Sequence, residues 1–321
     1  MAKPLIIFDT DMGTDCDDVA ALVMLDNLCE AGEAELLACT HSTRMTYGVT
    51  CTEVINRMYL SRQVPIGVTG LHKKIDDDQY DNYADCIARQ YFMSDKTVHN
   101  YPDAVDVMRA ALANAPDGSV TFIGVGQSTN FGSLLQSGPD DVSPLSGLDL
   151  VAKKSKELVL MAGFFDYTNL EEFKQCLNVE QSEYNVFQDI GAAQYVMDFW
   201  PTPIVFSGFE IGHWIITGKK LAHHGKTHPL TIAYSHFGGQ RYSWDQTAVL
   251  YAVRGLGGLW GVSRSGKVSV SDRGFTSFEP SEAGGHRYLV QKADPQEAAD
   301  LIDELMARQP MCKVWQEAEV V

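Results

Sequence analysis

Basic residues are scarce in this chain of 321 residues. Lys and Arg number 25 and Asp and Glu number 42, so the formal net charge at pH 7 is −17. A negative field of this size repels nucleic-acid phosphates and anionic lipids unless a local basic patch compensates, and the sequence shows no such patch. The imbalance argues against nucleic-acid and membrane-surface partners and favours a small molecule or a cation.

Long apolar runs and paired cysteine motifs are also missing. No stretch of about 18 apolar residues occurs, and the apolar run near the N-terminus soon reaches acidic residues, so we expect neither a signal peptide nor a membrane span. The seven cysteines form no C-x-x-C pair, and any disulfide scheme leaves one of them unpaired. This usage is typical of reduced thiols in a cytoplasmic protein, with most of the cysteines acting as small core residues.

What the sequence does contain is an alternation of short β-rich apolar runs with longer helical patterns. The runs predicted as strands are 5–8, 35–40, 66–69, 120–125, 157–161 and 203–206, and the helical patterns cover 19–29, 50–60, 104–113, 130–136 and 191–199. Such alternation predicts right-handed crossovers and an α/β fold with one doubly wound, mainly parallel sheet flanked by helices.

The part of the chain after Trp260 has a different pattern. Two short strands, 267–271 and 287–290, and a last helix, 295–307, are predicted there as a small C-terminal appendage. No repeat or linker divides the chain, so we expect residues 1–321 to form a single domain. Residues 208–229 are interpreted as a loop or flap because of their Gly and His content.

The first predicted strand runs into a concentrated group of aspartates. Ligands of doubly wound sheets bind beyond the carboxyl ends of the strands. Repulsion among carboxylates needs a cation or a helix N-terminus to compensate it, and oxygen ligands favour Ca²⁺ or Mg²⁺ over zinc. An EF-hand is excluded, because Thr14 and Ala20 occupy the loop positions that require Gly and Glu. The acidic group consists of Asp9, Asp11, Asp15, Asp17 and Asp18.

A plain structural interpretation exists for this group and for three later segments. Asp15 or Asp17 could cap the first helix, although capping explains one or two aspartates and not five, and the soft thiol of Cys16 is expected to turn inward. Thr129 or Asn130, and likewise Asp189, would cap the helices that follow them. Further along, Ser243 and Gln246 have capping-box spacing, which predicts a helix with Trp244 and Asp245 in its first turn.

Taken together, these segments resemble the inosine-uridine preferring nucleoside hydrolase family. The run D-T-D-M-G-T-D-C-D-D at 9–18 is similar to the family's D-x-D-x-G…D-D signature, with two extra residues before the Asp pair. G-Q-S-T-N at 126–130 resembles the family's G-P-L-T-N motif. M-A-G at 161–163, followed by Asn178 and by E-Y-N at 183–185, stands for its M-G-G…N…E-F-N, and W-D at 244–245 for its H-D.

The resemblance implies a Ca²⁺ ion and a ribose site. The implied metal ligands are the carboxylates of Asp11, Asp18 and Asp245 and the backbone carbonyl of Thr129, with Asp11 also acting as the base and Asp9 supporting the site from behind. The implied ribose ligands are Asp17, Asn178 and Glu183 (the last two at the 5′-hydroxyl), and Asn185 and Asp245 at the 3′-hydroxyl. Ser42 stands where many members have an Asn beneath the ribose.

The implied activity is calcium-dependent hydrolysis of the N-glycosidic bond of ribonucleosides, which yields ribose and a free base for purine salvage. Trp244 replaces the family's His, so the chain has an aromatic face where a proton donor would stand, and Trp244 is expected to act in catalysis by stabilising the departing base. This change favours purines, which present more π surface than pyrimidines. Members of the family also suggest a homodimer or homotetramer.

Two other functions stay open at this stage. A haloacid-dehalogenase-like phosphatase would use Asp9 and Asp11, but its D-x-D-G-T motif fits only with one extra residue, and it leaves Asp18 and Asp245 without a role. A calcium-dependent ribose or nucleoside-binding protein without catalysis is favoured by Trp244 and Ser42 and opposed by the retained Asp11.

The acid that protonates the leaving base is also open, and Glu210, His213 and His236 are candidates from a flap. His223, His224 and His228 could ligate a transition metal, but the neighbouring Gly225 and Pro229 favour an exposed loop. Asp76, Asp77 and Asp78 are interpreted as a solvated acidic loop.

Overall fold

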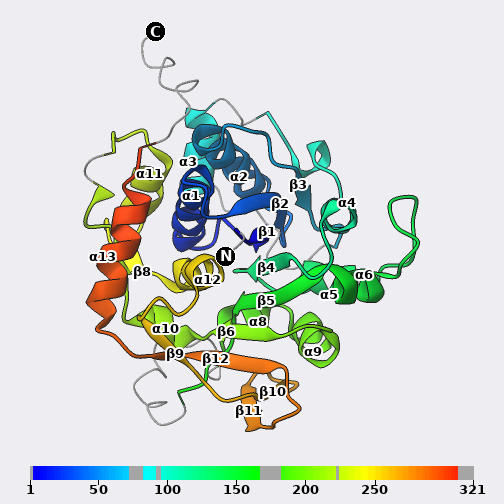
Figure 1. The fold of residues 1–321 in the computed structure, drawn as a ribbon. Coiled ribbons are helices and arrows are strands. Elements are labelled where there is room, and N and C mark those ends of the chain that lie inside the picture. The colour runs from blue at the N-terminus through cyan, green and yellow to red at the C-terminus, as the bar shows by residue number, and fades with distance from the viewer. Residues whose placement is uncertain (1–2, 72–81, 92–94, 167–181, 222–223, 310–321) are drawn as a thin grey trace.

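The structure is a computed structural model that describes residues 3–71, 82–91, 95–166, 182–221 and 224–309. Its centre is one large sheet (Figure 1). The strands of this sheet are β1 (Leu5–Thr10), β2 (Glu35–His41), β3 (Ile66–Val68), β4 (Val120–Gly124), β5 (Ser155–Met161), β6 (Ile204–Ser207), β9 (Trp260–Val262), β10 (Gly266–Val270), β11 (Thr276–Pro280) and β12 (His286–Gln291). Their order is β11-β10-β12-β6-β5-β4-β1-β2-β3, with β9 paired to β12.

The predicted doubly wound, mainly parallel sheet is confirmed. The strands from β3 to β6 pair in parallel, and β12 extends them in parallel beside β6. The antiparallel pairs are confined to the C-terminal part, where β9 and β10 pair with β12 and β11 pairs with β10. A second small sheet joins β7 (Ile216–Thr217) to β8 (Arg241–Tyr242). Because the strand order reverses beside β1, the ends of β1 and β4 lie where such sheets bind ligands.

Helices cover both faces of the sheet (Figure 1). One apolar cluster joins one face to the helices α1 (Asp17–Glu30), α2 (Thr46–Tyr59), α3 (Tyr83–Gln90), α11 (Pro229–Ser235), α12 (Trp244–Arg254) and α13 (Pro295–Met306). A second cluster joins the other face to α4 (Ala104–Asn114), α5 (Thr129–Gln136), α6 (Gly147–Lys154) and α9 (Ile190–Phe199). The remaining helices are short: η1 (Val98–Asn100), α8 (Tyr184–Gln188) and α10 (Phe209–His213).

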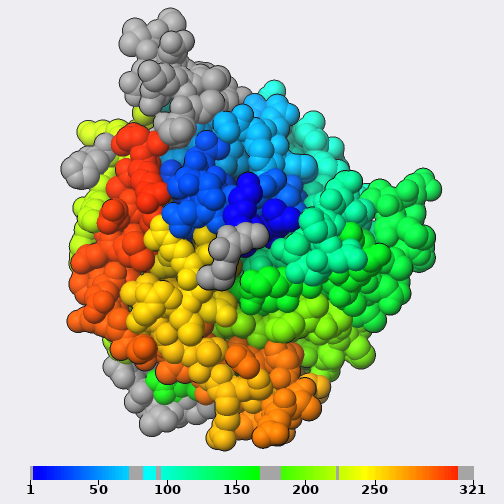
Figure 2. Space-filling model, in the orientation of Figure 1, coloured from blue at the N-terminus to red at the C-terminus, as the bar shows by residue number. Residues whose placement is uncertain are grey.

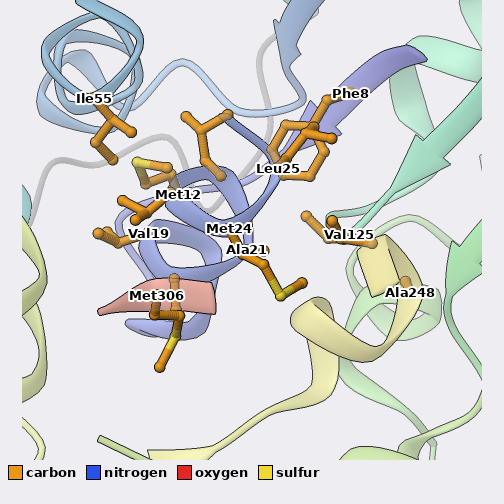
Figure 3. Close-up of a cluster of buried hydrophobic side chains, with 14 of the residues drawn as sticks. Phe8, Met12, Val19, Ala21, Met24, Leu25, Ile55, Val125, Ala248 and Met306 are labelled. Atoms are coloured by element: carbon orange, nitrogen blue, oxygen red, sulfur yellow. The ribbon is translucent and has the colours of Figure 1, made fainter. Parts of the chain in front are cut away.

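Helix α1 is buried around nearly its whole circumference, which is why its sequence is apolar without a polar face. Figure 3 shows Val19, Ala21, Met24 and Leu25 of this helix packed among side chains of the sheet and of neighbouring helices. The C-terminal helix α13 lies along α1, and the Asn27 side chain of α1 donates a hydrogen bond to the Leu305 carbonyl of α13 at 2.9 Å. Figure 2 shows α13 along one side of the molecular surface. The helix that carries the first aspartates is therefore held firmly at its position.

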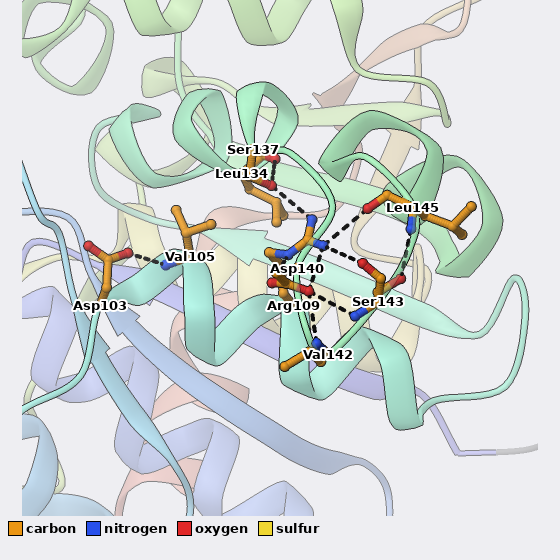
Figure 4. A network of polar contacts seen from close by, with 9 residues as sticks. All are labelled: Asp103, Val105, Arg109, Leu134, Ser137, Asp140, Val142, Ser143 and Leu145. Atoms are coloured by element: carbon orange, nitrogen blue, oxygen red, sulfur yellow. Dashed lines mark hydrogen bonds and ion pairs between the residues drawn. The ribbon is translucent and has the colours of Figure 1, made fainter.

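A buried arginine stabilises the helical layer on the other face of the sheet, which contains α4 and α5 (Figure 4). Arg109 of α4 is 1% exposed and forms an ion pair with Asp140, with Nε at 2.5 Å from a carboxylate oxygen. Its Nη atoms donate to the Ser137 hydroxyl and to the carbonyls of Ser143 and Leu145. These bonds anchor the loop that leaves α5, and α5 begins behind the ends of β1 and β4.

The interpretation of 208–229 as a loop or flap is wrong for its described part. The segment contains α10 and β7, and Glu210 and His213 are buried because α10 packs against α12. The interpretation of the histidines as an exposed loop is also wrong for the described residues. His224 and His228 are buried with ring centroids 3.9 Å apart, and His228 caps α11 and bonds the Tyr59 hydroxyl at 2.8 Å. His223 and the aspartates at 76–78 lie outside the described residues.

In the described part of the chain, no helix has the length and apolar character needed to cross a bilayer.

Candidate active site

A cavity of about 300 Å³ opens at the carboxyl ends of β1, β4 and β5. The residues that line it are Asp11, Thr14, Asp15, Asp17, Asp18, Val125, Met161, Glu183, Tyr184, Asn185, Phe209, Arg241, Trp244 and Asp245. Six of these are carboxylic acids and one is basic. The cavity therefore gathers side chains from segments that are far apart in the sequence, and most of the residues predicted for a site are among them.

The carboxylates reach the cavity because β1 ends beside β4 and its chain then folds back into α1. Asp9 is aligned with Gly124 in β4, and the loop that follows includes Gly13, which has a φ of +125° that side chains rarely allow. At Gly126 a Cβ atom would lie 2.7 Å from the Asp11 nitrogen and 2.9 Å from its Cβ. Only glycine at 126 lets the two strand ends approach this closely.

A trio of carboxylates forms the acidic centre of the cavity. Oxygen atoms of Asp17, Asp18 and Asp245 lie within 4.8 Å of one another, and all three residues are buried. The Asp245 amide donates to Asp17 at 3.3 Å, and the Thr10 hydroxyl donates to Asp18. Burial, followed by the charges of the neighbouring aspartates, raises the pKa of all three carboxyls well above the usual range.

Asp11 lines the same cavity, but its oxygens are not part of this trio. Its Oδ2 atom is buried and has no hydrogen-bond partner among the described residues. Burial, with a further contribution from Asp9, Glu183 and Asp15, raises the pKa of this carboxyl. A buried carboxylate oxygen without a donor is costly unless a ligand satisfies it.

Asp9 lies behind the cavity and not in its wall. It is fully buried, and one of its oxygens accepts from the Thr40 hydroxyl at 2.5 Å and from the Asn130 amide at 2.7 Å. Burial raises its pKa to about 7. Ser42 lies nearby and donates to the Thr10 carbonyl at 3.1 Å, so both residues support the end of β1.

Thr129 is not brought to the cavity. It is the first residue of α5, and its hydroxyl donates to Asp189 at 2.5 Å. The residue of this segment that lines the cavity is Val125, which directly follows β4.

Glu183 and Asn185 line the cavity, and the backbone around them fixes their side chains. Glu183 caps α8, where its carboxylate accepts from the backbone amides of Gly163, Asn185 and Val186 at 2.9 to 3.1 Å. The Asn185 amide group donates to the carbonyls of Val125 and Met161 at 2.8 and 3.0 Å. Both amide hydrogens are thereby used, so only Oδ1 is left to accept from a ligand. Asn178 lies outside the described residues.

Trp244 forms the aromatic side of the cavity together with Phe209. The two rings stack at 5.1 Å, and the indole nitrogen donates to the Phe209 carbonyl at 2.9 Å. His213 lies behind them, stacked on Phe209 at 5.4 Å and on Tyr242 at 4.8 Å. The indole therefore has a fixed orientation beside Asp245, with its donor turned away from any ligand.

The local predictions for the helix starts had mixed outcomes. Asp189 caps α9 as predicted, and Cys16 is fully buried as expected. Helix α12 begins as predicted, but the capping box is wrong: the Ser243 hydroxyl bonds Thr217 at 2.7 Å, and the Gln246 side chain donates to the Tyr234 hydroxyl at 3.1 Å. Neither side chain serves the helix end, because both are used by tertiary partners.

Sequence reasoning missed the partner of Asp15. Arg241 donates through Nε to both Asp15 oxygens at 2.9 and 3.0 Å, and its Nη2 also contacts this carboxylate. Asp15 is therefore in an ion pair and does not cap α1, whose first helical residue is Asp17. The two partners are far apart in sequence, so no local spacing announces them. Tyr184, which lies between the predicted Glu183 and Asn185, and Phe209 were also missed.

Tyr83 of α3 was missed as well. Its hydroxyl accepts from the Gly13 amide and donates to the Asp15 carbonyl, both at 2.6 Å. It thereby clamps the loop between β1 and α1 from outside the cavity.

Comparisons with known proteins agree with this architecture. Residues 6–312 match the family model described as inosine-uridine preferring nucleoside hydrolase. The fold is similar to that of an inosine-uridine preferring nucleoside hydrolase from Bacillus anthracis, with a TM-score of 0.70 at 15% identity over 95% of this chain and 99% of that one. It is also similar to a purine-preferring ribonucleoside hydrolase from Gardnerella vaginalis, with a TM-score of 0.68 at 17% identity over 94% and 99% of the two chains.

A third structure of similar fold is the type III effector protein XopQ complexed with adenosine diphosphate ribose, with a TM-score of 0.61 at 13% identity over 96% of this chain and 93% of that one. No curated protein matches the chain in sequence. The family match leaves no place for the haloacid-dehalogenase-like alternative, because it accounts for nearly the whole chain. The chain belongs to the inosine-uridine preferring nucleoside hydrolase family, and the expectation of an N-ribosyl hydrolase is confirmed.

Proposed function

We propose that the chain hydrolyses the N-glycosidic bond of ribonucleosides with a bound Ca²⁺ ion and prefers purine nucleosides. The observation that carries this proposal is the convergence, in one cavity, of the buried acidic trio, the orphaned oxygen of Asp11 and the stacked pair of Trp244 and Phe209. A sugar needs acceptors and a base needs an aromatic face, and the cavity offers both side by side.

The acidic centre fits a hard divalent cation. The three carboxylates are buried with their oxygens within 4.8 Å of one another. Among the described residues, no basic side chain forms a hydrogen bond with them, so they need a bound positive charge to remain ionised. Asp11, Asp18 and Asp245 would hold the ion, with Asp17 beside them. When bound, the cation would lower the pKa of a water molecule and hold ribose hydroxyls.

The chain's own residues would then perform the reaction. The free Oδ2 of Asp11 accepts a proton from the water that attacks C1′ of the ribose. Asn185 offers only its carbonyl oxygen, so it accepts a hydrogen bond from a ribose hydroxyl and does not donate one. Glu183 keeps α8 in place through its three backbone bonds and presents the same carboxylate to the sugar. Together these groups orient C1′ toward the water.

The proposed test is base release from a panel of nucleosides, with the metal content of the purified protein measured by elemental analysis. We expect one Ca²⁺ per chain and faster release from inosine, adenosine or guanosine than from uridine or cytidine. Trp244→Ala is expected to lose purine cleavage disproportionately, and Trp214→Ala is the matched control, because Trp214 is 45% exposed and does not line the cavity. Stoichiometric zinc without calcium would contradict the proposed metal. Fastest cleavage of uridine, together with unchanged activity of the Trp244→Ala variant, would contradict the proposed base preference.

A second candidate function is binding of a ribosyl ligand without hydrolysis. It is favoured by the similar fold of XopQ, which is described in complex with adenosine diphosphate ribose. Calorimetry with adenosine diphosphate ribose and with inosine, next to the base-release assay, separates the two functions. Tight binding without release of any base would replace the hydrolase proposal by this one.

A further inference from the structure

Arg241 is the one basic side chain among the described residues that line the cavity, where six acidic side chains surround it. Resting on the proposed function, we propose that Arg241 is a catalytic residue whose guanidinium stabilises the negative charge that develops on the departing nucleobase. Asp15 and the aromatic rings around Arg241 are positioning groups for it.

The guanidinium is held in one orientation by contacts on several sides. Its Nε and Nη2 atoms donate to Asp15, whose Oδ1 also accepts from the Cys16 amide at 2.7 Å. The central carbon lies 4.9 Å from the ring centre of Phe237 and 5.5 Å from those of Tyr242 and Trp244. Nη1 has no hydrogen bond to any described residue, so its two N–H groups are available to a ligand in the cavity. A preorganised donor of this kind needs no rearrangement when charge develops.

The position next to Trp244 places this donor on the base side of the cavity. Trp244 directly precedes Asp245 of the acidic trio, and the guanidinium carbon lies 5.5 Å from the Trp244 ring centre, so a base bound beside Trp244 and Phe209 comes next to Arg241. Purines and pyrimidines both carry ring nitrogens or carbonyl oxygens that accept hydrogen bonds near the glycosidic nitrogen. One arginine can therefore serve either class of base.

The step balances without a proton donor in the cavity. The C1′–N bond breaks and its electron pair stays on the nucleobase, while the attacking water forms the new C1′–O bond and gives its proton to Asp11. The base leaves as an anion paired with Arg241 and takes a proton from solvent after departure. The acids considered from sequence, Glu210, His213 and His236, do not line the cavity. Arginine itself stays protonated and acts through charge and hydrogen bonds.

The experiment compares two ribosides that differ in how much help the leaving group needs. The leaving group of p-nitrophenyl β-D-riboside is stable as an anion. The base that leaves inosine is less stable as an anion and needs more help to depart. For Arg241→Ala we expect kcat on inosine to fall by about 10²- to 10³-fold, the usual effect of removing one charge-stabilising donor, and kcat on the p-nitrophenyl riboside to fall less than about tenfold. Guanidinium chloride at millimolar concentration should restore part of the inosine activity.

Arg254→Ala is the matched control. Arg254 forms a two-pronged ion pair with Glu33 at 2.8 Å and is about as exposed as Arg241, but it lies at the far end of α12 and outside the cavity. Its removal should leave both activities unchanged. Arg241→Lys keeps the charge and guards against misfolding of the alanine variant; it should retain p-nitrophenyl riboside cleavage and lose most inosine cleavage, because a lysine cannot keep the paired bonds to Asp15.

The outcomes separate this inference from the proposed function. If the wild type cleaves both ribosides and the Arg241 variants lose equal factors on both, Arg241 is not a leaving-group residue, although the hydrolase function stands. If the wild type cleaves neither riboside, the proposed function is wrong and this inference falls with it. A selective loss on inosine, with calcium content unchanged, supports both.

Discussion

The aspartates near the first strand have four different environments, although they look equivalent in sequence. Asp9 is fully buried behind the site with two side-chain donors, Asp15 is paired with Arg241, and Asp17 and Asp18 join Asp245 in the acidic trio. Asp11 alone of the cavity aspartates has a buried oxygen without a described partner. Roles differ among these residues because donors from other parts of the chain reach some of them and not others.

The first prediction concerns Asp11. Asp11→Asn keeps the shape of the side chain but removes the proton acceptor, so kcat should fall by about two to four powers of ten. Nucleoside hydrolysis measured alongside elemental analysis checks this. Near-normal turnover with calcium retained would move the base to another residue, with Asp17 the nearest alternative.

The second prediction concerns Glu210 and pH. Burial, with a smaller contribution from Asp166 and Glu183, raises the pKa of this carboxyl to about 8 from an ordinary value of 4.5. The folded state therefore keeps a proton that the unfolded chain releases, and the free energy of unfolding falls as pH rises from 4.5 to 8. Glu210→Gln cannot ionise, so relative to the wild type it should gain stability on the order of 3 kcal/mol between pH 5 and pH 8.

Urea unfolding of both proteins at several pH values measures this difference. Glu279→Gln is the control, since Glu279 is exposed on β11. A stability difference between Glu210→Gln and the wild type that stays constant over this pH range would show that Glu210 has no shifted titration.

At the scale of single elements, the loop between β1 and α1 is held from outside by α3. Tyr83 bonds this loop at two backbone atoms, and Asn82, which caps α3, donates to the Gly13 carbonyl at 3.4 Å. From the other side, His41 of β2 donates to the Met12 carbonyl at 3.0 Å. The loop carries Asp15 and leads into the acidic trio, so its geometry depends on elements that do not touch the ligand.

The third prediction tests this clamp. Tyr83→Phe leaves the buried Gly13 amide and the partly buried Asp15 carbonyl without this partner, which should lower the free energy of unfolding by about 1–3 kcal/mol. Because the loop positions the site, kcat/KM should also fall, by roughly tenfold, as one misplaced group can cause. Steady-state kinetics and urea unfolding measure the two effects.

Tyr59→Phe is the matched control, because this buried tyrosine also loses one hydroxyl bond, to His228, but lies away from the cavity. It should lose stability without losing activity. If both variants keep full activity, the clamp is purely structural.

At the scale of the whole molecule, the net charge is −17, and part of the negative charge is concentrated in the cavity. Six acidic side chains line a cavity of about 300 Å³, and Arg241 compensates one of them. Folding brings these charges together against their repulsion, so a bound cation should stabilise the folded chain as a whole.

The fourth prediction follows from this linkage. Removal of the metal by a chelator should lower the unfolding temperature, and saturating Ca²⁺ should restore it, with a stabilisation of about 4 kcal/mol at a thousandfold excess over Kd. Calorimetry with Ca²⁺ and with Mg²⁺ additions measures the effect and ranks the ions. An unfolding temperature that does not change when elemental analysis proves the metal gone would contradict it. A single domain, a homodimer or homotetramer and a cytoplasmic location stay predictions.

The sequence by itself determined the strands β1 to β6 with the helices α1, α2, α4, α5 and α9 between them, the position of the acidic cluster at the end of β1 and the cap at Asp189. These features depend on neighbours in the chain: apolar periodicity sets an element, and a cap bonds an amide three residues away. The family motifs added residues 183–185 and 244–245 in the same local way. Their positions could be read because each motif is contiguous.

Only the tertiary structure decided which of these side chains meet. The Asp15–Arg241 pair, the alternative partners of Ser243 and Gln246, the burial of 208–213 and the absence of Thr129 from the cavity all depend on contacts between distant segments. A hydroxyl or carboxylate bonds the donor or acceptor that packing brings to it, and local spacing does not record that choice. For this reason Arg241, the basic residue among the described residues of the cavity lining, was found only in the folded chain.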